Sequence, residues 1–451
     1  MAELPFPCVV GDVEDSGAVE RLGLMQTSDI RSCLWNDTAS VPPETRPLAE
    51  SRRADVVVVG GGFTGLSAAL HLAEGGADTV LVEAQTAGFG ASGRNNGQVI
   101  PVYTRHNPDD VVREYGADQG ERMNAWVAGS ADLVFDLIRR HGIDCDAAQE
   151  GWLQPAHADS RLTGLRAKHD QWAARGAPVE MIDRDAMAAM TGSPIYRGGW
   201  MHRSGGHIQP LSYARGLARV AIEAGAAVYS ETPALELRRD GTGWRVITPA
   251  GEVATDTVLL ATNAYTDQLW PGLSRSIVPV RSFHIATAPL SANVAASILP
   301  EGHGLSDTRQ ALWAFRMDRQ NRLVTTCMPV TTFGARRVLR RSTLERLRQA
   351  YPQVPETAFD YVWDGKVAMT TDRLPRYHEL APGIHAGLGY SGRGIAIGTA
   401  MGKFLAERVL GQSGDTLPLP MTPLRTLPLH DLVVPLSRAL VLYYRWRDAR
   451  A

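Results

Sequence analysis

Three glycines and a glutamate early in the chain have the spacing of a site for a dinucleotide. Gly60, Gly62 and Gly65 form a G-x-G-x-x-G pattern, and Glu83 follows about 20 residues later. Gly60 permits a tight turn, Gly62 lets the backbone approach a pyrophosphate, and Gly65 lets a helix pack closely on a strand. The Glu83 carboxylate can accept hydrogen bonds from ribose hydroxyls. The combination predicts dinucleotide binding, although a glycine triplet alone would be weak evidence.

The segments around these glycines predict the elements that position them. Val56–Val59 is an apolar, β-branched run typical of a strand buried on both faces. A helix with leucines at helical spacing follows and ends at Gly75–Gly76, and Thr79–Val82 reads as a second strand. The amino end of that helix offers free N–H groups and a positive dipole end to phosphates.

A second glycine-rich run indicates which dinucleotide is bound. Gly88–Gly97 reads GFGASGRNNG, which is too irregular for a strand or a helix. A fold that binds only a nicotinamide dinucleotide does not need such a run after Glu83. A flavoenzyme does, because FAD extends past the first helix and its flavin half needs close contact with the backbone.

A third run of small residues lies far along the chain, in the segment 385–405. Gly387, Gly389, Gly392 and Gly394 predict another turn from a strand into a helix, here Ile395–Glu407. That helix would present its amino end to a bound group.

Together these motifs resemble the D-amino-acid-oxidase-type FAD superfamily. Within it they are similar to the amine oxidases typified by gamma-glutamylputrescine oxidase, in which G-x-G-A-S-G-R-N-x-G-Q recurs. The resemblance implies that a flavin takes a hydride at N5 from the carbon beside an amine nitrogen, that the imine hydrolyses, and that oxygen reoxidises the flavin to give hydrogen peroxide. The residues expected to bind FAD are Gly60, Gly62, Phe63, Thr64, Gly65, Glu83, Ala91, Ser92, Gly93, Arg94, Asn95, Asn96, Gly97, Ala234, Thr262, Gly389, Gly392, Gly394 and Ile395.

The resemblance also implies which residues lie near the reacting groups. Tyr390 belongs to the turn expected beside the flavin, and Arg393 stands where many relatives carry histidine. His207 lies in a loop that resembles a segment beside the flavin, although a hydrogen-bonded loop histidine explains it equally well. Arg373 lies in the segment leading back to the flavin. No catalytic dyad or triad is expected, because the cofactor carries the difficult chemistry.

Only the neutral form of an amine gives up a hydride. An aromatic wall suits a neutral amine better than a carboxylate does, so we expect aromatic side chains around the substrate. Tyr265, Trp313 and Trp363 are further candidates for that wall. Packing in the core is the competing interpretation for each of them.

Three departures from the relatives refine the expectation. The segment Ala368-Met-Thr-Thr replaces the cysteine-containing segment through which sarcosine-oxidase relatives attach flavin, so we expect non-covalent FAD. Ala396 stands where those relatives place a lysine for a small carboxylate, which favours a longer amine. No lysine occurs in 321–326, where such oxidases often keep one for oxygen activation.

The electron acceptor therefore stays open in the sequence. An amine or 2-hydroxy-acid dehydrogenase that reduces a quinone or a carrier protein is the alternative to an oxidase. A flavin-binding protein that has lost catalysis is a third interpretation, which the intact motifs disfavour.

The expected fold is α/β, with an FAD/NAD(P)-binding Rossmann-like domain and an inserted α+β substrate domain built on an antiparallel sheet. The resemblance implies that the FAD domain combines residues 51–105, 200–265 and 364–412. The substrate domain would combine 106–199 and 266–363, preceded by an arm, 1–50, and followed by a tail, 413–451. The local patterns also predict one long helix around Met123–Ile138 and a glycine-rich loop over Gly199–Gln209.

Composition excludes several classes of protein. With 451 residues, 44% hydrophobic and 21% charged, the chain can form a large core, and its net charge of −2 gives no case for a nucleic-acid partner. Four scattered cysteines and the absence of clustered histidine ligands predict a reducing cytoplasmic environment and no metal site. No transmembrane segment or secretory signal is expected.

The tail ends in a basic amphipathic pattern over Pro435–Arg450. Leu436, Tyr443 and Trp446 belong to its apolar face. Such a helix can lie on a membrane surface or pack on the body of the protein, and the shortness of its apolar face favours packing.

Overall fold

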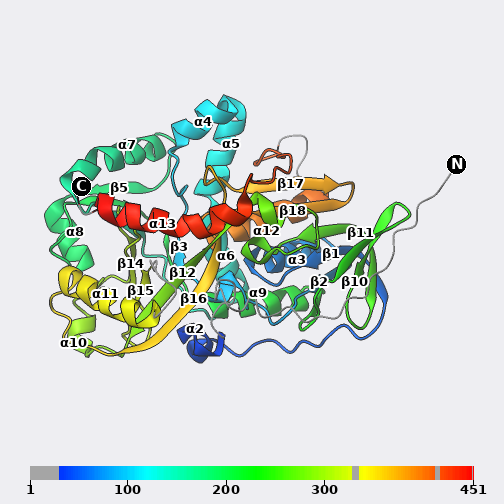
Figure 1. Cartoon of the computed structure of the whole chain (residues 1–451), viewed down its shortest axis with the longest axis horizontal. Coiled ribbons are helices and arrows are strands. Elements are labelled where there is room, and N and C mark those ends of the chain that lie inside the picture. The colour runs from blue at the N-terminus through cyan, green and yellow to red at the C-terminus, as the bar shows by residue number, and fades with distance from the viewer. Residues whose placement is uncertain (1–29, 328–334, 412–416, 449, 451) are drawn as a thin grey trace.

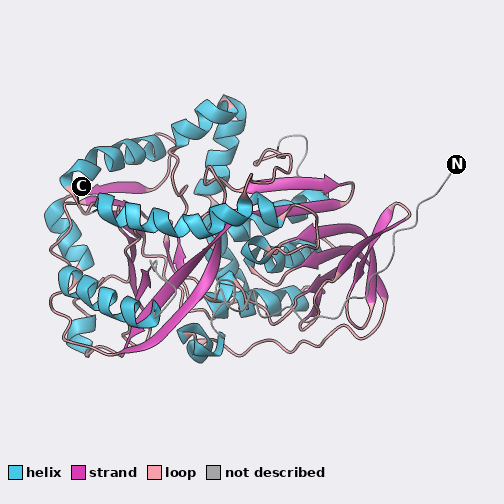
Figure 2. Ribbon diagram, viewed as in Figure 1, coloured by secondary structure: helices cyan, strands magenta, loops and turns pink. Residues whose placement is uncertain are grey.

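The computed structural model describes residues 30–327, 335–411, 417–448 and 450. Within these ranges the strands form two eight-stranded sheets and one two-stranded pair, and helices pack around them (Figures 1 and 2). The first 29 residues of the expected amino-terminal arm lie outside the described part. The rest of the arm contains the short helix α2 (Leu34–Thr38), whose Leu34 and Trp35 are buried.

The first sheet contains the predicted strand–turn–helix–strand unit. Its strands follow the order β17-β18-β11-β1-β2-β8, with β10 beside β11 and β9 beside β10. The pairs β1–β2, β1–β11, β2–β8 and β11–β18 are parallel. The bounds are β1 Arg52–Val59, β2 Thr79–Val82, β8 Ala227–Tyr229, β9 Glu236–Asp240, β10 Gly243–Ile247, β11 Glu252–Leu260, β17 Arg376–Ala381 and β18 Ile384–Leu388.

Helices α3 (Phe63–Glu74), α9 (Pro210–Glu223) and α12 (Ala396–Val409) pack beside one another against this sheet. Alternate residues of β1 explain how both faces are covered: Val56 and Val58 belong to the core under α3, and Val57 and Val59 belong to a second core on the other side. The all-apolar strand predicted at Val56–Val59 is therefore confirmed, with β1 starting four residues earlier.

The second sheet follows the order β16-β12-β15-β14-β13-β4-β6-β5. Its pairs are antiparallel except β13–β4, which is parallel. The bounds are β4 Trp152–Pro155, β5 Val179–Ile182, β6 Gly199–His202, β12 Val278–Thr287, β13 Gly304–Ser306, β14 Ala314–Met317, β15 Leu323–Cys327 and β16 Phe359–Met369.

The remaining elements are short or lie outside the two sheets. The strands β3 (Gln98–Val99) and β7 (Gly206–His207) pair with each other. The helices are α4 Pro108–Tyr115, α5 Ala117–Ala128, α6 Ser130–His141, α7 Leu162–Ala173, α8 Arg184–Thr191, α10 Ala292–Ala295, α11 Ala335–Ala350 and α13 His430–Asp448, with 3-10 turns η1 Ile30–Ser32, η2 Ala91–Gly93, η3 Asp159–Arg161, η4 Asn263–Tyr265 and η5 Ser274–Ser276.

Two sequence expectations about local structure are wrong. The long helix is two helices, α5 and α6, because Gly129 is both the carboxyl cap of the first and the amino cap of the second. The expected loop Gly199–Gln209 contains β6 and β7, because residues 199–202 pair with β4 and β5 on either side.

The strands of the second sheet also cross two expected domain boundaries. β6 begins at Gly199, so residue 200 does not mark the return to the first sheet. β16 extends to Met369 and pairs with β12 along its whole length, so the boundary at 364 cuts a strand. The division into an FAD domain and a substrate domain stays a prediction, and its boundaries move to the ends of these strands.

Candidate active site

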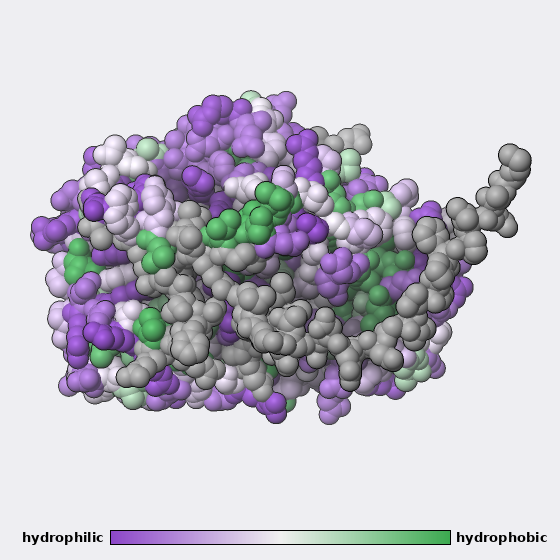
Figure 3. All heavy atoms as spheres, viewed as in Figure 1, coloured by the Kyte–Doolittle hydropathy of each residue, from purple (hydrophilic) through white to green (hydrophobic). Residues whose placement is uncertain are grey.

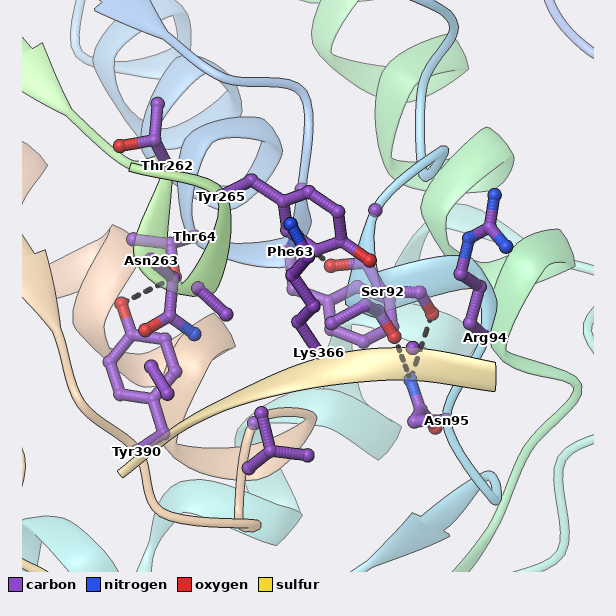
Figure 4. Close-up of a pocket in the computed structure, with 18 of the residues that line it drawn as sticks. Phe63, Thr64, Ser92, Arg94, Asn95, Thr262, Asn263, Tyr265, Lys366 and Tyr390 are labelled. Carbon is purple, nitrogen blue, oxygen red and sulfur yellow. Dashed lines mark hydrogen bonds between the residues drawn. The ribbon is translucent and has the colours of Figure 1, made fainter. Parts of the chain in front are cut away.

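A cavity of about 460 Å³ lies between the carboxyl ends of β1, β2 and β11 and the inner face of the second sheet. Its walls come from the amino end of α3, η2, η4, β12 and β16, and from the turn before α12. Figure 4 shows Phe63, Ser92, Tyr265, Lys366 and Tyr390 around it. Ligands bind at the carboxyl ends of parallel strands in open α/β sheets, so this cavity is the candidate active site.

The turn between β1 and α3 has the geometry needed to hold phosphates. Gly60 has a φ of +108°, a conformation that favours glycine. A side chain at Gly65 would place its Cβ 1.9 Å from the Gly60 carbonyl oxygen, so only glycine lets the helix approach the strand. The N–H of Phe63 donates to Ser92 Oγ at 3.0 Å, which links this helix end to the second glycine-rich run.

Glu83 closes the end of the cavity nearest β2. Its carboxylate accepts hydrogen bonds from the N–H of Gly61 at 2.6 Å and of Gln85 at 2.9 Å. Burial raises the pKa of Glu83, and these backbone donors oppose that rise because they favour the charged form. A fixed, half-buried carboxylate at this place can accept hydrogen bonds from ribose hydroxyls, as the spacing predicts.

The turn before α12 lies against α3 and forms the opposite wall. The Tyr390 hydroxyl donates to the Gly387 carbonyl oxygen at 2.9 Å and lies 2.7 Å from Thr64 Oγ1 (Figure 4). Burial raises the pKa of Tyr390. The hydroxyl therefore joins the two glycine-rich turns, and the ring forms part of the wall. No side chain caps the amino end of α12, whose preceding residues Gly394 and Ile395 line the cavity.

Arg393 lines the cavity, and its guanidinium is fixed by a hydrogen bond and by an aromatic ring. Its Nε donates to the Val102 carbonyl oxygen at 3.1 Å, and the group lies 5.7 Å from the centre of the Trp152 ring. Burial lowers the pKa of Arg393 to about 10, so the side chain still carries its charge at neutral pH.

The structure brings most of the predicted FAD-binding residues to this cavity. Those that line it are Gly60, Gly62, Phe63, Thr64, Glu83, Ala91, Ser92, Arg94, Asn95, Asn96, Gly97, Ala234, Thr262, Gly392, Gly394 and Ile395. Gly65, Gly93 and Gly389 are not among the lining residues. Each of these three packs closely against another part of a turn, at the Gly60 carbonyl, the Gly88 carbonyl and the Thr370 side chain respectively.

Two predicted catalytic residues, His207 and Arg373, do not reach the cavity, which corrects their expected position. His207 lies on β7, where its backbone pairs with Gln98 and bridges to Ala148, and burial lowers its pKa. Arg373 has a φ of +68° and donates from Nη1 to the Thr370 carbonyl oxygen. The Arg373 side chain therefore holds its own turn, and His207 is buried on β7 away from the cavity.

Two further residues, which the sequence analysis did not predict as site residues, also line the cavity. His284 on β12 contacts Thr326 Oγ1 through Nδ1 at 3.1 Å, and burial lowers its pKa to about 4, so the ring is neutral at physiological pH. Lys366 on β16 places Nζ 5.3 Å from the centre of the Tyr265 ring, and burial lowers its pKa (Figure 4). The rarity of lysine, with three in the chain, was the available signal for Lys366.

The expected aromatic wall is only partly correct. Tyr265 and Tyr390 line the cavity. Trp313 packs in the core of the second sheet, and Trp363 packs beside Trp35 and donates from Nε1 to the Arg94 carbonyl oxygen at 2.9 Å. The core interpretation is the right one for both tryptophans.

Two helix amino ends and the Glu83 carboxylate meet at one cavity. This arrangement is typical of an oxidoreductase that binds a flavin dinucleotide. A family model described as DAO, FAD dependent oxidoreductase, matches residues 55–408. The chain therefore belongs to the DAO family of FAD-dependent oxidoreductases, and its cofactor is FAD.

Individual relatives agree with this assignment. The chain is 34% identical to gamma-glutamylputrescine oxidoreductase of Escherichia coli (strain K12), over 89% of this chain and 94% of the relative. It is 32% identical to a probable oxidoreductase, OrdL, of Haemophilus influenzae, over 81% of this chain and 85% of the relative.

A solved structure shows the same fold. The crystal structure of glycine oxidase from Geobacillus kaustophilus has a TM-score of 0.67 to this chain at 22% identity, and covers 83% of this chain and 100% of that one.

Proposed function

We propose that this enzyme oxidises a C–N bond of an amine or amino-acid-like substrate and passes the electrons to oxygen, which gives hydrogen peroxide. The observation that carries the proposal is the single cavity that combines two helix amino ends, from α3 and α12, with a substrate side made by the second sheet. The similarity to gamma-glutamylputrescine oxidoreductase supports an amine substrate.

Different residues of the cavity would hold different parts of FAD. The amino end of α3 would hold the pyrophosphate and Glu83 would accept hydrogen bonds from the adenosine ribose. The amino end of α12, after Gly394 and Ile395, stabilises negative charge near the flavin. FAD, when bound, supplies the hydride acceptor. Ala368 lines the cavity and has no thiol, which supports non-covalent binding.

The substrate side of the cavity carries no carboxylate among the described residues that line it from the second sheet. Those residues are Ser282, His284, Ser306, Leu312, Ala314, Thr326, Gly365, Lys366, Val367 and Ala368. The carboxylates that line the cavity, Glu83 and Asp267, follow β2 and η4 and not the strands of this wall. A protonated amine against this wall would find no anionic partner on it, so the wall favours the neutral amine that can lose a hydride. The neutral His284 ring can hydrogen-bond to that amine.

Lys366 on this wall and Arg393 in the turn before α12 bring positive charge to the cavity, and this charge suggests a second feature of the substrate. Arg393 already donates to Val102, and within the described residues Lys366 has neither a hydrogen bond nor an ion pair. An amine that also bears a carboxylate would pair with one of these cations. The proposed substrate class is therefore a carboxylate-bearing amine, longer than a small α-amino acid because Ala396 stands where relatives place a lysine.

Oxygen is proposed as the acceptor on the basis of Lys366. Residues 323–327 of β15 contain no lysine, but β16 brings Lys366 to the same cavity from a neighbouring part of the sheet. A cation there would stabilise negative charge that develops on oxygen. The second candidate function is a dehydrogenase that reduces a quinone or a carrier protein.

A substrate panel tests the proposal. Purified enzyme would be mixed in air with a gamma-glutamylated diamine, the free diamine, an N-methyl amino acid and a 2-hydroxy acid, with hydrogen peroxide measured against time. We expect the highest kcat/KM with the amine that carries a carboxylate. Turnover of the hydroxy acid alone would contradict the proposed substrate class. Flavin reduction without peroxide would favour the dehydrogenase.

A further inference from the structure

The last helix, α13, lies across the face of the molecule shown in Figure 1 and is fixed at both ends. Near its start, His430 Nε2 bonds to the Ile277 carbonyl oxygen at 2.9 Å. At its end, the Asp448 carboxylate accepts hydrogen bonds from the N–H groups of Gln310 at 3.0 Å and Ala311 at 2.8 Å. These contacts set how the helix is rotated about its own axis.

The rotation turns the apolar side of α13 away from the protein. At about 100° per residue, His430 and Asp448 share the side that faces the body, and Leu432, Leu436, Tyr443 and Trp446 share the opposite side. Leu436 is 65% exposed, Tyr443 48% and Trp446 55%. Figure 3 shows green side chains gathered over the first half of this helix. The side chains of this face that the structure describes therefore do not pack on the body, contrary to the expectation, and Ala439 and Leu440 of the same face lie outside the described side chains.

Two arginines lie beside the exposed face near the end of the helix. By sequence, residues 417–451 contain five arginines and two aspartates, a net charge of +3 in a chain whose net charge is −2. One of the two aspartates, Asp448, is engaged with the backbone of the loop below. The Arg450 guanidinium lies 3.9 Å from the centre of the Trp446 ring, and Arg447 lies 6.0 Å from that of Tyr443. The arginines therefore lie beside the exposed aromatic rings.

We propose that α13 is the surface by which this protein binds an anionic lipid bilayer. Exposed leucines, a tyrosine and a tryptophan beside arginines are the features of a helix that lies in the membrane interface. A second copy of the chain would bring two faces of like charge together, whereas anionic headgroups complement the arginines. Of the helices in the described ranges, none has the length and hydropathy to cross a bilayer, so the docking is peripheral.

Docking would place the cavity close to the lipid. The loop that binds Asp448 continues into Leu312, which lines the cavity, and Ile277 directly precedes β12, which contributes Ser282 and His284. If the enzyme is the dehydrogenase named as the second candidate function, a cavity close to the lipid would let electrons reach a quinone in the membrane. The docking itself does not depend on that function.

Co-sedimentation of the full chain with vesicles tests the proposal. One set of vesicles contains phosphatidylcholine alone and the other contains phosphatidylcholine with phosphatidylglycerol. We expect binding to the second set only, weakened by salt. Replacement of both arginines, Arg447→Gln with Arg450→Gln, should weaken binding about 25-fold, since each basic residue contributes about fivefold. Leu436→Ser with Trp446→Ser should weaken it at least about tenfold.

Leu235→Ser is the matched control, because Leu235 is 58% exposed and lies beside β9, in the first sheet. This control should bind as the unchanged protein does. Absorbance of bound flavin in every variant shows that the chain is folded. Absence of binding to phosphatidylglycerol vesicles overturns the proposal. A dimer in analytical ultracentrifugation that Leu436→Ser dissociates, without vesicle binding, assigns the face to a second copy and also overturns it.

Discussion

At the level of single residues, small groups leave room for the cofactor. Gly62 is the clearest case, because a Cβ there would lie 3.0 Å from Ser92 Oγ at the amino end of α3. A larger side chain would occupy the space in which the pyrophosphate binds.

We therefore predict that Gly62→Leu yields a folded protein that does not retain FAD. The ratio of flavin absorbance to protein absorbance after gel filtration measures the loss. Gly164→Leu, in α7 with open space around its Cβ, is the control and should keep the flavin. A yellow, active Gly62→Leu enzyme would contradict the position of the phosphate site.

Lys366 gives a prediction about the acceptor. In Lys366→Met, the rate of flavin reoxidation by oxygen should fall about 100-fold, because the cation that stabilises charge on oxygen is gone. The rate of anaerobic flavin bleaching by substrate should change much less. Stopped-flow absorbance separates the two steps, and Lys403→Met, on the outer part of α12, is the control. An unchanged reoxidation rate would assign Lys366 to substrate binding or to structure.

The sequence predicts some of these residues and misses others for a physical reason. Gly62, Ser92 and Glu83 lie in one short stretch whose spacing fixes their neighbours. Lys366 and His284 reach the cavity only because β16 pairs with β12 in one register, with Lys366 opposite Arg281 and His284 opposite Trp363. A shift of β16 by one residue along β12 would turn the Lys366 side chain to the other face of the sheet.

At the level of elements, the contact between α3 and α12 holds the two glycine-rich turns together. A Cβ on Gly402 would lie 2.3 Å from the Thr64 carbonyl oxygen, so the helices touch backbone to backbone there. The hydrogen bond between Thr64 and Tyr390 closes the same contact at the cavity.

This contact predicts a large loss of stability in Gly402→Leu. Separation of the helices by one side chain should cost at least about 3 kcal/mol, since the clash is with backbone that cannot move aside. Thermal unfolding of the apoprotein followed by circular dichroism measures it, with Gly164→Leu as the control. A change in Tm of less than about 2 °C would show that α12 can shift.

Helices and strands with strong local signals were predictable, and irregular ones were not. The strand β1 and the helices α3 and α9 carry regular apolar spacing. The break between α5 and α6 depends on one glycine, and β6 forms because two distant segments pair with it. Those pairings are tertiary events that no local pattern of Gly199–Gln209 contains.

At the level of the whole molecule, two sheets assembled from alternating segments enclose one cavity. This arrangement buries several histidines. The pKa values of His202 and His284 are lowered to about 4 by burial, and that of the partly buried His157 also to about 4. Burial raises the pKa of Asp307 to about 6.

These shifts predict that acid destabilises the fold between about pH 6.5 and pH 4. As the pH falls, the unfolded chain takes up protons on its histidines before the folded chain does. Each fully buried histidine therefore lowers the free energy of unfolding by on the order of 3 kcal/mol over this pH range. Asp307 acts in the opposite direction by a similar amount, because its folded form takes up the proton first. The histidines are more numerous, so Tm should fall when the pH is lowered from 7 to 5. His202→Asn should reduce that fall, and a Tm independent of pH over this range would contradict the burial of these rings.

Anaerobic titration of the purified holoenzyme with a carboxylate-bearing amine, followed by the admission of air, tests the central proposal most directly. We expect the oxidised flavin absorbance to bleach with one equivalent of substrate and to return in air with one equivalent of hydrogen peroxide. Flavin that is not reduced by any amine or amino acid, but is reduced by a 2-hydroxy acid, would contradict it.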